Sequence, residues 1–392
     1  MKKILLIAIL ITNTCWAEEK NKVNDACLKF KKEIDDYALS DEERKKIAES
    51  SVLSTSFIWE NDAFSGTGDI HYTNGMKFSQ IDNPCKRRSF IITDYLKGVL
   101  NLLLVDPNKN IMRSYSTGYT VGMNMYTPNN IKISSRNRND RPYAGYLYYG
   151  LLIQSTDRVD SYVKGDQVTS EIKKADSFEL QLGVVGPAAQ QETIQKFVHE
   201  YITDSAKPLG WDHQIDNRFT INLSFISRYN QFYGRDKTKP NDSYLRTTWH
   251  YGFNAGNMMN FLNAGVMFSF GKPRDNYPLT TIQPSLHDEK SLFKKKVKGG
   301  ASCKCDAWYL FAGIDYRGIE SSIFVEGDKY AAHDIKLISG VYDTIYGFTY
   351  INDTDDFKFI YKIIDRSKEF DSADQTLAEP HKIAQIAFEW SI

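Results

Sequence analysis

The last ten residues, 383-IAQIAFEWSI-392, contribute most to deciding the fold class. Successive side chains of a strand point to opposite faces. Ile386, Phe388, Trp390 and Ile392 therefore share one face, opposite Ala387, Glu389 and Ser391. A terminal amphipathic strand that finishes on aromatic and apolar residues is what the outer-membrane assembly machinery is generally thought to read. The pattern favours a bacterial outer-membrane protein over a soluble one.

The same alternation recurs upstream in stretches of about ten residues, as in transmembrane barrels. Within 178–185, 218–228 and 262–270, apolar residues alternate with polar or small ones. The pattern predicts an all-β fold, a transmembrane antiparallel barrel of about twelve strands with short helices in its loops. The expected strands are 51–60, 71–82, 113–126, 141–156, 176–186, 218–232, 243–256, 258–271, 304–319, 333–350, 356–367 and 381–392.

With the N-terminus in the periplasm, the connections 61–70, 127–140 and 187–217 lie outside the cell. Two connections have helical character: a periplasmic amphipathic helix is expected over 88–104 and an external helix over 188–202. Gln191, Gln195 and His199 recur at four-residue steps and so share one face of the second helix.

Residues 1–17 combine Lys2 and Lys3, an apolar stretch and a small residue, Ala17, and we interpret them as a signal peptide. Lipidation at Cys15 is the alternative. Residues 18–50 are charged and helix-prone, which indicates a periplasmic extension, and 51–392 form the barrel. Beyond residue 17 no run of 18 apolar residues exists, so helical membrane spans are not expected.

Composition excludes one partner class and supports the membrane assignment. The 49 basic and 49 acidic residues balance, so nucleic acid is not an expected partner. Aromatic residues make up 13% of the chain, as expected for the aromatic girdles of a barrel. We expect a monomer in the Gram-negative outer membrane.

Four cysteines follow the signal peptide: Cys27, Cys85, Cys303 and Cys305. All four fall on the periplasmic side of the strand count, where disulfides form. Cys303 and Cys305 are too close in sequence for an easy mutual bridge, so Cys27 and Cys85 pair with each other or with these two. A zinc site at Cys303 and Cys305 is weakly supported, because no second pair stands at zinc spacing.

The first segment with chemical potential is 59-WENDAFSGTGDIHYTNG-75, at the external end of the first hairpin. It gathers Glu60, Asn61, Asp62, Asp69 and His71 around a glycine-rich turn. Crowded oxygen ligands suit a hard cation such as Ca²⁺, although the spacing is not that of an EF-hand. Ordinary polar loop residues are the competing interpretation.

The second segment, 136-RNRNDRPYAGY-146, carries Arg136, Arg138 and Arg141, with Lys132 just before it. Such a patch at the outer rim would bind lipopolysaccharide phosphates. The alternative is a solvated loop in which Arg141 pairs with Asp140 or with a carboxylate in the lumen.

The third segment, 186-GPAAQQETIQKFVH-199, is followed by 210-GWDHQ-214. His199 is the candidate general base, and His213 competes with it. The chain lacks the motifs of serine hydrolases, zincins and P-loop enzymes, so the chemistry would use a histidine and a cation.

These motifs, in this order, resemble the lipid A 3′-O-deacylase (LpxR-type) family of Gram-negative outer membranes. The resemblance runs from about residue 51 to 392 and also includes 271-GKPRD-275 and 366-RSKEF-370. It implies a twelve-stranded barrel whose active site lies between the wall and an external helix. It further implies that a bound Ca²⁺ stabilises the oxyanion while a histidine activates water.

Carried onto this chain, the resemblance makes His199, Asn61 and Asp62 catalytic, with Asp62 at the Ca²⁺ site. Lys132 and Arg141 would bind the lipopolysaccharide substrate. Asn61 and Asp62 have opposite parity in the strand, so both serve one site only if the chain has left its regular pleat there.

The expected function is Ca²⁺-dependent hydrolysis of the 3′ acyloxyacyl ester of lipid A in the outer leaflet. One rival is an outer-membrane phospholipase that uses the same histidine and cation. A second rival is a non-enzymatic channel or surface-binding barrel, which an open lumen would favour. Lumen residues such as Glu179, Gln181, Asn222 and Arg228 are large enough to plug it.

Overall fold

The structure is a computed structural model of the 392-residue chain. It describes residues 27, 41–66, 68–83, 85, 114–164, 167–235, 245–272, 306–327, 334–352 and 357–391. The expected signal peptide, the expected helix over 88–104, Cys303 and Cys305 lie outside these residues.

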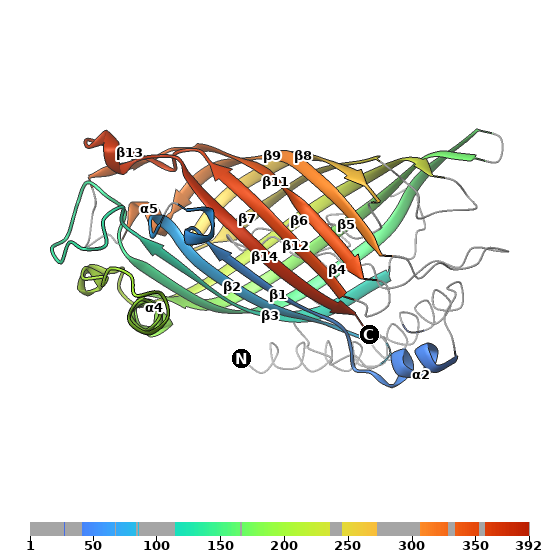
Figure 1. Ribbon diagram of the computed structural model, residues 1–392, viewed down its shortest axis with the longest axis horizontal. Coiled ribbons are helices and arrows are strands. Elements are labelled where there is room, and N and C mark those ends of the chain that lie inside the picture. Colours follow the sequence, from blue (N-terminus) through green and yellow to red (C-terminus); the bar gives the residue numbers. More distant parts are fainter. Residues whose placement is uncertain are drawn as a thin grey trace, which may run out of the picture.

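Twelve antiparallel strands close into one barrel, which confirms the expected fold (Figure 1). Around the barrel the strands follow one another in the order β1-β14-β12-β11-β9-β8-β7-β6-β5-β4-β3-β2. Among the described residues, no helix has the length and apolar character needed to cross a membrane. The strands are β1 (Val52–Asn61), β2 (His71–Asp82), β3 (Ser114–Thr127), β4 (Ala144–Lys164), β5 (Gln167–Val185), β6 (Arg218–Arg235), β7 (Leu245–Gly256), β8 (Met259–Gly271), β9 (Ala307–Ser322), β11 (Gly340–Asn352), β12 (Phe357–Arg366) and β14 (His381–Ser391).

Most strand boundaries lie within three residues of the expected ones, and larger differences occur in two places. The β4–β5 hairpin runs to Lys164 and Gln167, beyond the expected ends at 156 and 176. Within the expected strand 333–350, residues Ile335–Leu337 form a separate strand, β10, which pairs with β13 (Phe370–Ser372) outside the barrel. Short strands of this kind carry no alternation of their own, since three residues are less than two periods.

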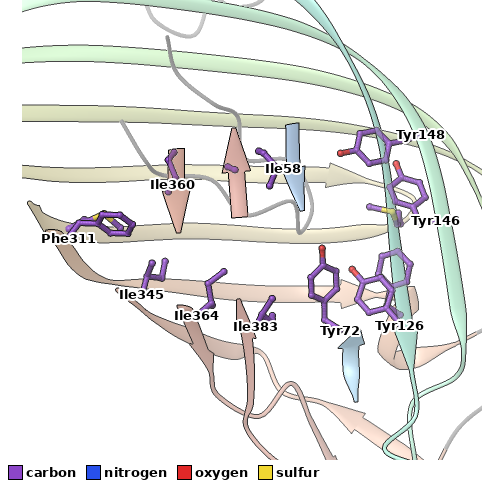
Figure 2. Close-up of a cluster of buried hydrophobic side chains, with 14 of the residues drawn as sticks. Ile58, Tyr72, Tyr126, Tyr146, Tyr148, Phe311, Ile345, Ile360, Ile364 and Ile383 are labelled. Carbon is purple, nitrogen blue, oxygen red and sulfur yellow. The ribbon is translucent and has the colours of Figure 1, made fainter. Parts of the chain in front are cut away.

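The two faces of the wall have the polarity that the alternation predicts. Leu262, Phe268 and Phe270 on β8 are 69%, 54% and 62% exposed on the outer face. The expected lumen residues Glu179, Gln181, Asn222 and Arg228 are completely buried. Figure 2 shows a further set of buried side chains, including Ile58, Tyr72, Tyr126, Tyr148 and Ile345, which belongs to one apolar cluster. The described lumen is therefore packed with side chains.

We call the end of the barrel that carries loops 62–70, 128–143, 186–217 and 367–380 the external end. A chain of buried ion pairs crosses it. Arg141 donates to Glu369 at 2.9 Å, and Arg366 reaches the same carboxylate at 3.5 Å. Arg366 and Arg317 in turn both donate to Asp343. Each charge has a partner of opposite sign, which is how buried charges are tolerated.

The helix α5 (Ile323–Glu326) contacts this ion-pair chain through Arg141. Arg141 donates to the carbonyl of Phe324, and the Phe324 ring stacks on Tyr126 with ring centroids 4.1 Å apart. The helix and the ion pairs together fill the external mouth, so the described residues provide no support for a channel.

At the opposite end, the N-terminal extension is attached to the barrel. Its helix α2 (Asp41–Glu49) accepts a hydrogen bond at the Ile47 carbonyl from Asn83, which follows β2. A disulfide joins Cys27 to Cys85. This bridge is one of the pairings that the sequence leaves open.

We expect two of the four mature thiols to resist alkylation in unreduced protein from native membranes, because Cys27 and Cys85 are bonded to each other. Mass spectrometry after non-reducing digestion should give one peptide pair joined through these residues. Full alkylation of all four thiols would contradict this expectation. The Cys27→Ser variant is the control, since it should leave Cys85 open to alkylation.

Candidate functional site

The first element of the candidate site is the end of β1, where the chain leaves its pleat. Asn61 is the last strand residue and pairs with Asn74 of β2. Asp62 has φ −74° and ψ −32°, a helical conformation, and it begins the short helix η1 (Ala63–Ser65). The Asn61 side chain accepts from the Ala63 backbone at 2.8 Å and donates to the Asn74 side chain at 3.3 Å. In a regular strand Asn61 and Asp62 would point to opposite faces, but the helical conformation at Asp62 removes this constraint.

Asp62 is fully buried beneath the turn of loop 62–70. Its Oδ2 accepts a hydrogen bond from the Ile70 backbone at 2.7 Å. Burial raises the pKa of the Asp62 carboxyl well above its usual range, and the neighbouring Asp69 carboxylate raises it further. The hydrogen bond from Ile70 acts in the opposite direction. A nearby cation would favour the ionised form of both acids.

The second element is the external helix expected over 188–202, which the structure confirms. After Gly186 the chain forms η2 (Pro187–Ala189), then α4 (Gln191–Val198), and it ends in a π-helical turn, η3 (His199–Thr203). As expected, Gln191, Gln195 and His199 share the buried face. A Cβ on Gly145 of β4 would approach the Gln191 side chain to 2.6 Å, so this glycine lets α4 lie close against the wall.

His199 contacts an acceptor at each ring nitrogen. Nδ1 lies 2.6 Å from the Ala206 carbonyl, and Nε2 lies 2.7 Å from Asp69 Oδ2. Because a carbonyl can only accept, Nδ1 carries the proton. Burial raises the pKa of the Asp69 carboxyl, while His199 and the Gln195 amide lower it. These contacts place the imidazole beside Asp69, whose charge in turn acts on Asp62.

The motif 210-GWDHQ-214 contacts helix α4, which leads into the turn that carries His199. The Trp211 indole donates to Gln195 Oε1 at 2.7 Å, one helical turn before His199. Trp211 is buried and its ring contacts Tyr143, while His213 is exposed on η4 (Trp211–His213). The competitor His213 is therefore outside the contact network of Asp62, Asp69 and His199.

The basic loop 128–143 lies next to the segment that leads into η4, because the Leu209 backbone donates a hydrogen bond to the Ile131 carbonyl at 2.9 Å. Lys132 is exposed, and Arg138 forms an exposed ion pair with Asp334. A hollow in the surface is lined by Pro128, Asn130, Ile133, Ser135, Arg136, Asn137, Arg141, Pro142, Tyr143, Gly210 and His213. Its lining includes two arginines and no carboxylate.

The structure does not place the Arg141 side chain at the rim, where a substrate phosphate was expected to contact it. Arg141 is 1% exposed, and its guanidinium is committed to Glu369 and to the Phe324 carbonyl. This matches the alternative in which Arg141 pairs with a buried carboxylate. Asp140 instead accepts from the backbone N–H groups of Asn129 and Arg141, and burial raises its pKa to about 6.

Two features of the site were not assigned from the sequence. Asp69 was recognised only as one of several oxygen ligands, whereas it contacts His199 across 130 positions of sequence. Asn74 contacts both Asn61 and the Trp59 indole, at 3.3 and 2.8 Å. Asn74 lies in the HYTNG segment and Asp69 just before it, but their contacts become visible only when strands and loops are paired.

The oxygen donors fit a hard cation in part. Asp62 and Asp69 provide carboxylates, and Asn61 provides an amide oxygen, the ligand types that Ca²⁺ prefers. No group of three or more His, Cys, Asp and Glu side chains suited to a metal ion occurs within the described ranges. Amide, carbonyl and water oxygens would have to complete the coordination, as is usual for Ca²⁺.

The comparisons with known proteins agree with this architecture. The family described as outer membrane protein LpxR matches residues 5–392. The solved structure of LpxR from Salmonella typhimurium superposes with a TM-score of 0.59 at 13% identity, covering 86% of this chain and 100% of that one. The β domain of the Bordetella autotransporter BrkA covers 88% of this chain and 100% of its own at 7% identity, with a TM-score of only 0.37. No curated protein matches the chain by sequence.

Proposed function

Because the chain belongs to the LpxR family of outer-membrane proteins, we propose that it hydrolyses the 3′ acyloxyacyl ester of lipid A in the outer leaflet. The observation that carries the proposal is the contact of His199 with Asp69 beside buried Asp62. Helix α4, which leads into the turn that carries His199, lies at the same end of the barrel as α5 and β13 (Figure 1). An ester in the surrounding leaflet would reach it from the side.

In the proposed reaction, His199 takes a proton from water as the water oxygen attacks the ester carbonyl. The bond between the acyl carbon and the sugar oxygen then breaks, and the proton passes from His199 to the sugar oxygen. The products are a fatty acid and a free sugar hydroxyl. The Nδ1–H group donates to the Ala206 carbonyl, so Nε2 becomes the accepting atom of the neutral imidazole once Asp69 no longer occupies that position. The Asp69 carboxylate, 2.7 Å from Nε2, has to move aside for water to occupy that position.

Asp62, Asp69 and Asn61 would hold the Ca²⁺ ion, which when bound would stabilise negative charge on the ester oxygen. The Asp69 carboxylate raises the pKa of Asp62, as expected for two acids close enough to share a cation, and this supports the assignment. Movement of Asp69 toward the cation site would also free Nε2. Asp69 thus has a positioning role for His199 in addition to its role as a ligand.

We propose that the exposed Lys132 and the arginine-lined hollow bind a glucosamine phosphate. Arg136 and Arg141 both line it, and the absence of carboxylates in the lining favours an anion. Arg141 then acts mainly through its ion pair with Glu369, which holds the loop against the barrel. An outer-membrane phospholipase remains the rival activity, because the same histidine and cation would cleave a glycerophospholipid ester.

Expression in a heterologous Gram-negative host tests the proposal. Mass spectra of lipid A should lose the mass of the 3′ acyloxyacyl group, and chelation of Ca²⁺ during a membrane assay should abolish the loss. Unchanged lipid A together with released phospholipid fatty acids would establish the rival activity. Full activity after exhaustive chelation would refute the cation assignment at Asp62.

A further inference from the structure

Helix α4 and its π-helical turn have an inverted distribution of polarity. The face against the wall carries Gln191, Gln195 and His199, which are 1%, 3% and 6% exposed. The outward side carries Phe197, Tyr201 and Ile202, which are 55%, 69% and 66% exposed. A helix surrounded by water normally places its apolar residues inward and its polar residues outward.

The outward residues form a continuous surface. Phe197 and Tyr201 are four positions apart, and their ring centroids lie 5.2 Å from each other. Ile202 follows directly in the π-helical turn. We call Phe197, Tyr201 and Ile202 the aromatic ledge. Large exposed apolar patches mark sites of contact with a partner or a membrane.

The position of α4 on the wall indicates which partner covers the ledge. Gln191 contacts the Met123 sulfur at 3.4 Å and lies over Gly145, so the helix rests on the outer face of β3 and β4. Two residues further along the same face of these strands are Val121 and Leu147, which are 42% and 38% exposed. Two strand residues span only about 7 Å. The ledge therefore continues the apolar outer surface of the barrel past its external rim.

We infer that the aromatic ledge inserts into the outer leaflet of the membrane and contacts the acyl chains of its lipids near their headgroups. Aromatic side chains are favoured at this depth because one part of the ring system meets hydrocarbon while a tyrosine hydroxyl remains hydrated. The ledge lies on the opposite side of the helix from His199, so the leaflet holds α4 against the wall from outside. This inference rests on the barrel and on α4, and it does not require the proposed reaction.

Site-specific photo-crosslinking tests the inference in the intact membrane. Benzoylphenylalanine replaces Phe197 in full-length protein that also carries His199→Ala, so turnover cannot affect the result. Asp212, an exposed residue on η4, is the matched control position. Illumination should produce a lipopolysaccharide or phospholipid adduct severalfold more abundant at position 197 than at position 212.

Two other outcomes would overturn the inference. A crosslinked dimer in place of lipid adducts would show that a second copy of the chain covers the ledge. Equal lipid adducts at positions 197 and 212, or none at either, would show that the ledge has no preferred contact with lipid.

A kinetic experiment separates this role from a catalytic one if the proposed reaction holds. The double variant Phe197→Ser/Tyr201→Ser should raise KM for substrate in bilayer vesicles by about tenfold or more, as expected when large apolar side chains are lost from an apolar contact. Its kcat, and its KM for substrate dispersed in detergent, should match those of the wild type. Heat-modifiable migration on gels verifies that the barrel is folded. An unchanged KM in vesicles would contradict the inference.

Discussion

The His199→Ala variant is expected to lose deacylation by ~10²–10⁴-fold, the usual cost of removing a general base. His199 lies on the external helix and not in the hydrogen-bonded wall, so strand pairing should survive its replacement. Lipid A mass spectra from expressing cells measure the loss, and heat-modifiable migration on gels reports the folded barrel. His213→Ala should retain activity, because His213 is exposed and outside the network around Asp69.

A second substitution distinguishes chemistry from loop ordering. His199→Asn places an amide N–H near the position of Nδ1, where it can donate to the Ala206 carbonyl. It should be as inactive as His199→Ala, because it has no basic nitrogen at the position of Nε2. Substantial activity in His199→Asn would mean that the residue orders the loop and is not the base. An inactive His213→Ala beside an active His199→Ala would transfer the base to His213.

The Asp62→Asn variant is expected to lose activity by at least ~10²-fold and to gain stability in metal-free buffer. The activity loss follows if the carboxylate holds the cation that stabilises developing negative charge. The stability gain follows from burial, which raises the pKa of Asp62 in the folded protein. Ionisation therefore costs folding free energy as the pH rises above the unfolded value, about 3.9. The neutral amide avoids that cost.

Urea unfolding followed by gel mobility measures this difference across pH. The gap between variant and wild type should be absent well below pH 4 and should grow as the pH rises toward the raised pKa of Asp62. Saturating Ca²⁺ should stabilise the wild type, by about 2.7 kcal/mol at a hundredfold excess over Kd, and should not stabilise Asp62→Asn. Equal stabilisation of both proteins by Ca²⁺ would locate the cation elsewhere.

The fold was largely predictable because the membrane imposes a period of two on each strand. The terminal strand, the outward face of β8 and the buried lumen residues all followed from alternation. The periodicity failed in the β4–β5 hairpin, where the expected strands stopped near 156 and 176 but the ladder continues to the turn. Residues such as Asp157, Lys164 and Lys173 carry charge there, so no hydrophobic pattern marks these strand positions.

The candidate site was predictable only in part. His199 and the end of β1 were identified from their motifs, and the helical face shared with Gln195 followed from spacing. The role of Asp69 and the burial of Arg141 depended on contacts across 130 and 228 positions of sequence. Local spacing cannot reveal such pairs. The backbone change at Asp62 was anticipated as a requirement, but its cause, the helical turn at Ala63–Ser65, needed coordinates.

The closed external mouth has a consequence for kinetics. With α5 and the ion pairs of Arg141 and Arg366 filling the external mouth, a lipid substrate of the proposed reaction would reach His199 by diffusing sideways within its own monolayer. Turnover would then depend on the mole fraction of lipid A among its neighbours and not on its concentration in the bulk. Diluting a suspension of cells would leave the rate per enzyme unchanged. Mixing inert lipid or detergent into the same surface would slow it.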